Sequence, residues 1–218
     1  MNKVLIAPSI LSADFSAMGN AVKEIEVCGA DLVHCDVMDG LFVPNITFGI
    51  KMVKDIKPLT KLPLDVHLMI VEPERYLKQF IDAGADYLTV HYEACKQPVS
   101  EVLDEIRKLG AKSAVSIKPD TPTSVLKELI PHSDMILLMS VYPGFGGQKF
   151  IEQSIERLEE ITEMIKESGC NVLLEIDGGV TEENAGKIIK AGANVLVAGS
   201  TVFKSQDKAK TILQLKNS

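Results

Sequence analysis

The sequence lacks a hydrophobic run long enough to cross a membrane. Its longer apolar stretches, such as residues 135–139, fall far short of the ~18 residues that a spanning helix needs. The N-terminus, MNKVLIAPSIL, enters strand-like residues directly, without the separate apolar region and small-residue cleavage site of a secretion signal. We therefore expect no membrane partner and a cytoplasmic location.

The chain also has few cysteines and little positive charge. Its four cysteines, Cys28, Cys35, Cys95 and Cys170, show neither close pairing nor metal-knuckle spacing, which predicts reduced thiols that fill the core. The net charge is -7, so a nucleic acid partner is not expected, because binding to its phosphates depends on clustered Lys and Arg. A small phosphorylated ligand would instead need backbone N–H groups at glycine turns and helix starts.

Short apolar runs alternate with amphipathic segments along the whole chain, and buried parallel strands read as such nearly continuous apolar runs. Strands are predicted over Val4–Ile6, Leu32–Val37, Leu64–Met69, Tyr87–His91, Ser113–Ile117, Met135–Met139, Val172–Ile176 and Val195–Ala198. Helices are predicted over Ala17–Val27, Glu74–Ala83, Val99–Leu109, Ser124–Ile130, Gln153–Glu167, Glu182–Ala191 and Gln206–Leu215.

This alternation predicts an α/β fold in which residues 1–218 form one (β/α)8 TIM barrel domain, because eight such units close most economically as a barrel. A doubly wound open sheet is the alternative fold. A short sequence pattern that repeats along the chain favours the barrel. Gly29, Gly84, Gly110 and Gly192, each followed by Ala, stand between a predicted helix and the next strand, where glycine supplies the left-handed helix stop.

Polar or small residues stand where the predicted strands end, which is where a barrel of this kind builds its active site. In chain order they are Ser9, His34, Asp36, His67, His91, Lys118, Ser140, Asp177, Gly199 and Ser200. His34 and Asp36 are two positions apart on one strand, so both side chains project from the same face.

Two imidazoles and two carboxylates, from His34, Asp36, His67 and Asp177, would together form an N2O2 site for one divalent ion, Zn²⁺, Fe²⁺, Mn²⁺ or Co²⁺. A single histidine of this kind is more often an ordinary hydrogen-bonded residue inside the barrel. Several buried ionisable groups that face each other are costly unless a charge or a reaction uses them, and this favours the metal site.

Three methionines, Met38, Met69 and Met139, also fall near strand ends. Methionine commonly fills gaps in a core, and that is the simpler interpretation. The functional alternative is that these side chains line the reacting centre and shield an anionic intermediate from water.

Glycine-rich turns follow the last three predicted strands. They contain Gly144, Phe145, Gly146 and Gly147, then Gly178 and Gly179, then Gly199 and Ser200. Loops after the seventh and eighth strands are the customary phosphate site of this architecture, since glycine lets backbone N–H groups approach an anion. Three such turns at neighbouring strand ends predict phosphate binding.

Six segments closely resemble the ribulose-phosphate 3-epimerase family in order and spacing. They are APSILSADF at 7–15, HCDVMDGLFVPNITFG at 34–49, DVHLMIVEPE at 65–74, LLMSVYPGFGGQKFI at 137–151, EIDGGV at 175–180 and VAGSTVF at 197–203. The resemblance implies a ribulose-phosphate binding barrel. It also implies a metal-dependent isomerase that converts D-ribulose 5-phosphate to D-xylulose 5-phosphate, in the pentose phosphate pathway, through an enediolate.

The resemblance also implies roles for single residues. A divalent metal is held by His34, Asp36, His67 and Asp177, and Asp36 and Asp177 are the catalytic acid/base pair. Ser9 and His67 contact the substrate, and the glycine-rich turns hold its phosphate. Inversion at C3 requires the proton to leave from one face and return to the other, which two carboxylates on opposite sides of the sugar would accomplish.

Two positions depart from the usual wording of the family, and both concern the choice of sugar. Lys118 stands where the family commonly has Asn, and Tyr142 stands where it often has Asn or Glu. These two side chains either change the sugar preference or point to solvent and neighbouring loops. The nearest alternative function is a D-allulose-6-phosphate 3-epimerase. A Schiff-base aldolase that uses Lys118 and a sugar-phosphate sensor without turnover are alternatives of other classes. The helical exterior of a barrel often supports self-association, so a homo-oligomer is expected.

Overall fold

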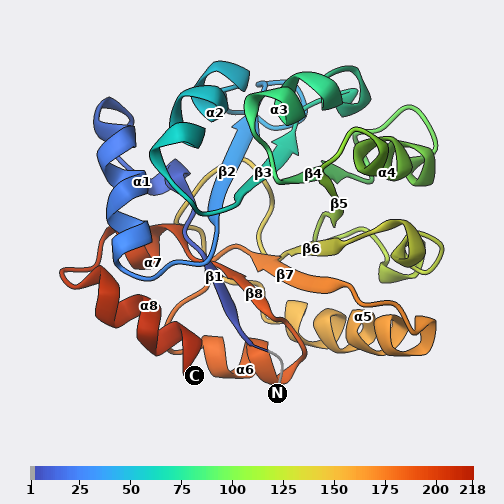
Figure 1. Cartoon of the computed structure of the whole chain (residues 1–218). Coiled ribbons are helices and arrows are strands. Elements are labelled where there is room, and N and C mark those ends of the chain that lie inside the picture. Colours follow the sequence, from blue (N-terminus) through green and yellow to red (C-terminus); the bar gives the residue numbers. More distant parts are fainter. Residues whose placement is uncertain (1–2) are drawn as a thin grey trace.

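A computed structural model of the chain describes residues 3–218, and its centre is one sheet of parallel strands (Figure 1). The strands are β1 (Leu5–Ala7), β2 (Val33–Met38), β3 (Leu64–Met69), β4 (Tyr87–His91), β5 (Lys112–Ile117), β6 (Met135–Met139), β7 (Leu173–Asp177) and β8 (Val195–Val197). All eight pair in the order β1-β8-β7-β6-β5-β4-β3-β2. Each strand therefore lies beside its neighbour in sequence, with β1 returning to β8.

The seam between β1 and β2 nearly closes the sheet. Beyond the end of β1, Ser9 forms a parallel bridge with His34, and the backbone N–H of His34 donates to the carbonyl of Pro8 at 3.2 Å. The predicted barrel is thus confirmed, and the open doubly wound sheet is wrong, because its two edges would be far apart. The closure also brings two of the predicted site residues, Ser9 and His34, together.

Helices surround the sheet on its outside (Figure 1). They are α1 (Met18–Val27), α2 (Ile50–Ile56), α3 (Leu77–Ala83), α4 (Val99–Lys108), α5 (Ser154–Ser168), α6 (Ala185–Lys190), α7 (Gly199–Phe203) and α8 (Lys208–Lys216). Short 3₁₀ segments cover Ile10–Ser12, Phe15–Ala17, Lys57–Leu59, Pro73–Arg75, Thr123–Leu126 and Ile130–His132. No helix in residues 3–218 combines the length and the apolar character that a membrane crossing requires.

Helix α4 illustrates why these segments become helices. Its buried residues are Val99, Val102, Leu103 and Ile106, which share one face because they are three or four positions apart. Gly110 then adopts a φ of 101°, the left-handed conformation that ends the helix cheaply only when the residue is glycine. The same conformation recurs at the other three glycines predicted to stop helices, with φ between 92° and 115°.

One predicted helix is absent from the structure, and two observed helices were not predicted. The helix predicted over Ser124–Ile130 is wrong, since two 3₁₀ segments separated by a turn occupy this region. Pro131 lacks a backbone N–H, and so short a segment cannot offset the cost of starting an α-helix. Helices α2 and α7 were not predicted. Neither has a polar side chain capping its first turn, and α7 begins with glycine, a poor helix former.

The interior of the barrel contains apolar and polar side chains. Ala7, Ala114, Met135, Val195 and Val197 belong to a small apolar cluster. The buried polar side chains include His34, Asp36, Asp65, His67, Thr89, His91 and Glu175. Alternation along each strand sends every second side chain inward, so this polar layer arises from the strand period itself. All four cysteines are free thiols.

Candidate active site

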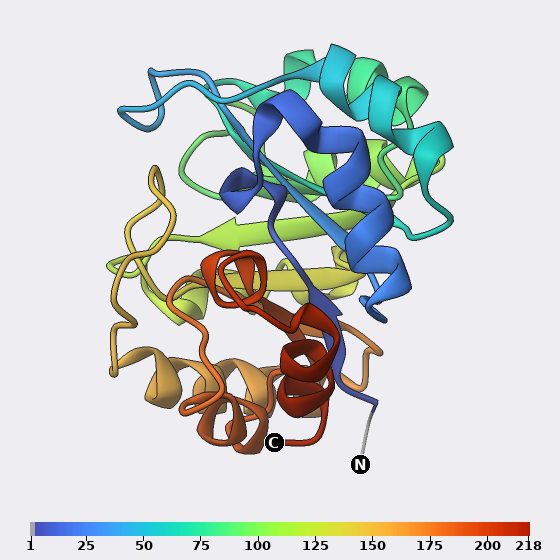
Figure 2. The ribbon, with the colours of Figure 1, turned by 90° about the vertical axis from the view of Figure 1, so that its left-hand side faces the viewer.

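A cavity opens at the carboxyl ends of the strands. In the side view, the loops after β2 and β6 extend beyond these ends (Figure 2). The cavity is lined by residues from both ends of the chain: Ser9, Leu11, Ser12, Asp36, Met38, Met69, Met139, Val141, Pro143, Gly144, Phe145, Gly146, Gly147, Gln148, Asp177, Gly178, Gly179, Val180, Val197, Gly199 and Ser200. The three glycine-rich turns and the three methionines predicted from the sequence therefore line the same cavity.

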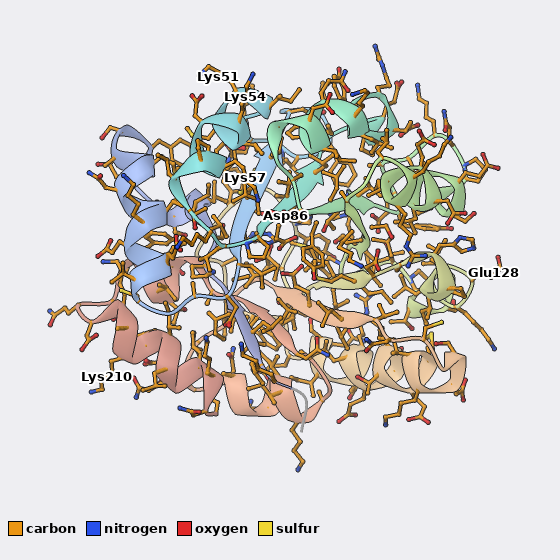
Figure 3. The ribbon with its side chains drawn as sticks, in the orientation of Figure 1. Lys51, Lys54, Lys57, Asp86, Glu128 and Lys210 are labelled. Atoms are coloured by element: carbon orange, nitrogen blue, oxygen red, sulfur yellow. The ribbon has the colours of Figure 1, made fainter. Side chains whose placement is uncertain are left out.

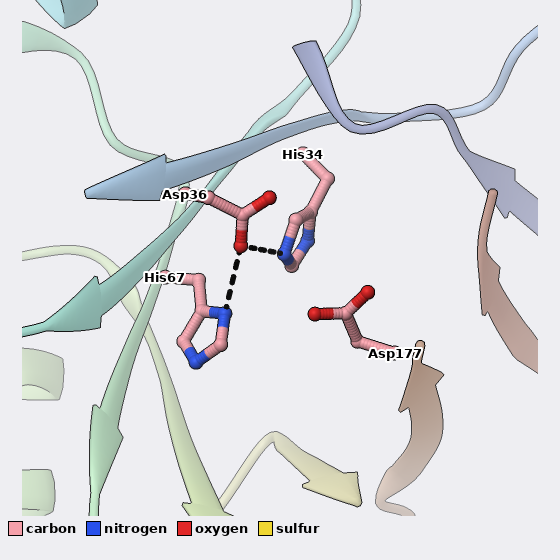
Figure 4. A group of neighbouring side chains, drawn as sticks. All are labelled: His34, Asp36, His67 and Asp177. Carbon is pink, nitrogen blue, oxygen red and sulfur yellow. Dashed lines mark hydrogen bonds and ion pairs between the residues drawn. The ribbon is translucent and has the colours of Figure 1, made fainter. Parts of the chain in front are cut away.

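Four side chains converge at the base of this cavity (Figure 4). His34, Asp36, His67 and Asp177 each present one nitrogen or oxygen, and these atoms all lie within 4.8 Å of one another. Oδ1 of Asp36 lies 3.3 Å from Nε2 of His34 and 3.2 Å from Nδ1 of His67. Asp177 faces the same space from the opposite side (Figure 4).

The imidazole of His34 is held by a carboxylate behind it. Its Nδ1 lies 2.5 Å from Oδ2 of Asp65, so Nδ1 carries the proton and donates it. Its Nε2, which faces the four-residue cluster, is buried without a hydrogen-bond partner in the described chain. Burial opposes a charge on His34, but the charges of Asp65 and Asp36 raise its pKa well above the usual range. In the metal-free protein a proton therefore occupies Nε2, where a cation would otherwise bind.

The imidazole of His67 lies between Asp36 and a second histidine. Its Nε2 is 2.9 Å from Nε2 of His91, and Nδ1 of His91 is 3.2 Å from Oε2 of Glu93. Burial lowers the pKa of His91 to about 4, so this ring is neutral at physiological pH. Burial would raise the pKa of Glu93, but hydrogen bonds from His91, the backbone N–H of Lys118 and Thr121 lower it to about 2.

The two aspartates of the cluster differ in their affinity for a proton. Burial would raise the pKa of Asp36, but the positive charge of the neighbouring His34 holds it well below its usual range. For Asp177, burial and the nearby charge of Asp36 raise the pKa to about 6. One carboxylate is thus ionised and the other takes up a proton near neutral pH, which is what an acid/base pair requires.

Ser9 fixes the orientation of the ionised carboxylate. Its hydroxyl lies 2.5 Å from Oδ2 of Asp36 and donates to it, which leaves Oδ1 facing the two imidazoles. Ser9 is placed for this contact by the bridge that closes the barrel at His34. The same serine lines the cavity, so its position also suits contact with a ligand.

The donor set of the cluster fits a divalent metal. Two imidazole nitrogens and two carboxylates are ligands that Zn²⁺, Fe²⁺, Mn²⁺ and Co²⁺ accept. The unpartnered Nε2 of His34 and the two facing carboxylates are costly in a buried site unless a proton or a cation lies between them. A second group, His34, Asp65 and Glu175, lies within the barrel, where burial and the charge of Asp65 raise the pKa of Glu175 well above its usual range.

The glycine-rich turns bring backbone close to the cavity. A Cβ at Gly179 would collide with the backbone of Phe150, and one at Gly178 would collide with Val141. Gly178 and Gly179 also have φ of 120° and 64°, so glycine is required at both. Gln148 steadies the turn after β6 through hydrogen bonds to the carbonyls of Tyr142 and Phe145, at 2.7 and 2.8 Å.

Three residues singled out from the sequence, His67, Lys118 and Tyr142, do not line the cavity. His67 is fully buried at its base and is absent from its wall, so direct contact with a ligand there is less favoured than a role within the cluster. Lys118 extends its ammonium over the ring of Phe42, 4.0 Å from the ring centre, and Tyr142 is 56% exposed. Neither lines the cavity, which favours the interpretation that both point to solvent and neighbouring loops.

Some lining residues were not predicted from the sequence. Ser12 lies near the glycines of two turns, since a Cβ at Gly199 would be 2.7 Å from its hydroxyl oxygen and one at Gly146 would be 3.7 Å away. Gln148 also lines the cavity. Ser12 lies in the same loop as Ser9, and Gln148 directly follows a glycine turn. Their positions just after predicted strand ends could therefore have identified both as candidate cavity residues.

Comparisons with known proteins agree with this geometry. Residues 5–203 match a family model described as the ribulose-phosphate 3 epimerase family. A ribulose-phosphate 3-epimerase of Bacillus subtilis (strain 168) is 49% identical over 216 residues, covering 99% of this chain and 99% of the relative. A chloroplastic ribulose-5-phosphate-3-epimerase of Arabidopsis thaliana is 48% identical, covering 99% of this chain and 77% of the relative.

Solved structures with much lower identity share the fold. A mutant tryptophan synthase alpha-subunit of Pyrococcus furiosus superposes with a TM-score of 0.72 at 17% identity, with both chains fully covered. A thiamine phosphate pyrophosphorylase of Pyrococcus furiosus gives a TM-score of 0.66 at 16% identity, covering 99% of this chain and 95% of the other. These likenesses concern the barrel alone.

The raised pKa of Asp177 predicts a stability effect in the metal-free protein. Its pKa is about 6 in the folded state against an ordinary value of 3.8, so ionisation of Asp177 opposes folding. Asp177→Asn should raise the melting temperature above pH 6. The gain should shrink as the pH falls from 6 and vanish below 3.8, where the wild-type carboxyl becomes protonated in both states. Thermal unfolding with excess chelator measures this.

The matched control is Glu128→Gln, which makes the same chemical change on the outer surface (Figure 3). Its melting temperature should follow that of the wild type at every pH. An Asp177→Asn variant that is no more stable than the wild type at neutral pH would contradict the raised pKa.

Proposed function

The chain belongs to the ribulose-phosphate 3-epimerase family, and we propose that it interconverts D-ribulose 5-phosphate and D-xylulose 5-phosphate by epimerisation at C3. The observation that carries the proposal is the pair of carboxylates, Asp36 and Asp177, that face one another across a space bordered by two imidazoles. Family membership identifies the enzyme as an isomerase. The facing carboxylates support the two-base chemistry that inversion requires.

We further propose that His34, Asp36, His67 and Asp177 hold one divalent metal, Zn²⁺, Fe²⁺, Mn²⁺ or Co²⁺. A metal bound there supplies a Lewis acid that stabilises the negative charge arising on substrate oxygens when the C3 proton is removed. His34 and His67 direct ring nitrogens towards the cluster. Asp65 supports His34 from behind, as is usual for a histidine that binds metal.

In the proposed reaction, Asp36 and Asp177 act on opposite faces of the sugar. Either carboxylate takes the C3 proton from one epimer, and the other returns a proton to the opposite face. The strong preference of Asp36 for its ionised form and the pKa of about 6 for Asp177 support this exchange of roles. Ser9 holds the carboxylate of Asp36 in place through its hydroxyl.

The methionines contribute by excluding water. Met38 and Met69 are neighbours across β2 and β3, and Met139 is beside Asp177 across β6 and β7. All three are buried and line the cavity. An apolar wall strengthens charge interactions in the site and keeps solvent from the enediolate.

The phosphate of the substrate is proposed to bind at the glycine-rich turns after β6, β7 and β8. Two observations support this: the turns line one cavity, and Gly178 and Gly179 leave no space for side chains. Asn45 joins the loop after β2 to the loop after β6 by donating to the carbonyl of Gly144 at 2.9 Å.

The alternatives receive less support. The relatives compared are named for ribulose phosphate, so D-allulose 6-phosphate is not favoured. A Schiff-base aldolase would need Lys118 at the reacting centre, whereas its ammonium lies over Phe42 outside the cavity wall. A sensor without turnover would have no use for the paired carboxylates.

The sugar and its phosphate are tested by a panel of three substrates. We expect the highest kcat/KM for D-ribulose 5-phosphate and a lower value for D-allulose 6-phosphate. Unphosphorylated ribulose should lose at least about 100-fold, because binding energy at the phosphate positions the reacting carbon. Comparable efficiency with and without the phosphate would refute the phosphate site, and a preference for the allulose ester would refute the proposed sugar.

The roles of the aspartates are tested by Asp36→Asn and Asp177→Asn. Each should lower net epimerisation by at least about 100-fold, because general acid–base catalysis contributes about that much or more. Either variant should still exchange the C3 proton of one epimer, and of that epimer alone, with deuterated solvent. Product formation and exchange are followed by NMR.

Bound metal is quantified in both variants, since asparagine also weakens metal binding. Asp82→Asn, on the exposed surface of α3, is the matched control and should retain full activity. If one active-site variant keeps its metal and epimerises at nearly the wild-type rate, the two-base assignment is wrong.

A further inference from the structure

A histidine presents a lone pair to a metal from one ring nitrogen only if its proton sits on the other. For His67, Nδ1 faces Asp36 at 3.2 Å and Nε2 faces His91 at 2.9 Å. The contact between the two imidazoles is short enough for a hydrogen bond, so one ring must donate and the other accept. The direction of this single bond decides which nitrogen of His67 is free.

Glu93 sets that direction. As an ionised carboxylate it only accepts, so the 3.2 Å contact with Nδ1 of His91 places the proton of the neutral His91 ring on Nδ1. Nε2 of His91 then carries a lone pair and accepts from Nε2 of His67. The lone pair of His67 is consequently on Nδ1, which faces Asp36 and the four-residue cluster.

The carboxylate of Glu93 is itself fixed by the loop after β5. Its Oε1 accepts the backbone N–H of Lys118 at 2.8 Å and the hydroxyl of Thr121. Arg157, a residue that is 8% exposed, donates from its guanidinium to the carbonyls of Lys118, Pro119 and Thr121 and so holds this loop in place. Oε2 of Glu93 is therefore left for His91.

The ring of His91 is also restrained by packing. It stacks on His67 with ring centres 5.0 Å apart, and Phe42 lies against it at 4.8 Å. His91 is fully buried, so solvent does not compete for its two hydrogen bonds. Its orientation thus follows from its neighbours rather than from a metal.

We propose that Glu93 and His91 are positioning residues that, by a chain of hydrogen bonds, hold the proton of His67 on Nε2 and its lone pair towards the metal site. This inference rests on the proposed metal site. It assigns to β4, which supplies no metal ligand, the role that Asp65 of β3 plays for His34. His34 and His67 each direct a lone pair towards the metal site. The proton of His34 is held by a carboxylate, and that of His67 by a second imidazole.

Glu93→Gln tests the direction of these hydrogen bonds, because Gln has nearly the same shape as Glu. The amide oxygen must replace Oε1, because the N–H of Lys118 needs an acceptor there. The amide NH2 then faces Nδ1 of His91 and donates to it. The proton of His91 moves to Nε2, which donates to His67, and the proton of His67 moves to Nδ1, where it blocks the metal.

We expect Glu93→Gln to weaken Zn²⁺ binding by about 10-fold to 100-fold in a competition with a chelator, the usual effect of losing such support. In the metal-free protein at mildly alkaline pH, ¹⁵N NMR should show the His67 proton on Nε2 in the wild type and on Nδ1 in the variant. Glu74→Gln is the matched control, since Glu74 accepts backbone N–H groups of Lys96 and Gln97. It should bind Zn²⁺ as the wild type does.

His91→Phe provides an independent variant that keeps the stacking but removes the acceptor. It should also lose Zn²⁺ affinity. Wild-type affinity in either folded variant, with the His67 proton still on Nε2, would overturn the inference. A wild type that binds no Zn²⁺ but keeps this proton on Nε2 would overturn the proposed metal site while supporting the hydrogen-bond chain, so the two failures are distinguishable.

Discussion

The structure depends on one electrostatic constraint: two carboxylates and two imidazoles face one another at the base of the cavity, with ligand atoms within 4.8 Å. Such a group is stable only with protons or a cation between its members, because the barrel provides little water to separate the charges. The metal-free protein meets the constraint with protons, which explains the raised pKa values of His34 and Asp177. A divalent cation would also satisfy this constraint, and it would stabilise the negative charge that arises when the C3 proton is removed.

The fold meets this constraint by alternation and closure. Every second residue of a strand faces inward, so β2 alone directs His34 and Asp36 to one point. Closure of the sheet between β1 and β2 then brings Ser9 to Asp36. Behind the four-residue cluster, carboxylates on β3 and after β4 orient the rings, while the glycine-rich turns line the cavity.

Much of this was predictable from the sequence because it depends on local patterns. Apolar runs identified the strands, and the two-residue spacing of His34 and Asp36 indicated a shared face. The supporting contacts were not predictable, because Asp65 and Glu93 meet their histidines across strands, and the direction of a proton depends on several loops together. Ser124–Ile130 was predicted wrongly because proline and the neighbouring contacts outweigh its helical pattern.

The central claim is that the four-residue cluster binds one metal ion. Anomalous X-ray diffraction from crystals of the protein loaded with Mn²⁺ or Zn²⁺ tests it most directly, because it locates the ion independently of activity. We predict one ion bound by Nε2 of His34, Nδ1 of His67 and an oxygen from each of Asp36 and Asp177. The account would be contradicted by crystals in which this position is empty at saturating metal, or in which the ion binds elsewhere, while the protein in solution retains full turnover.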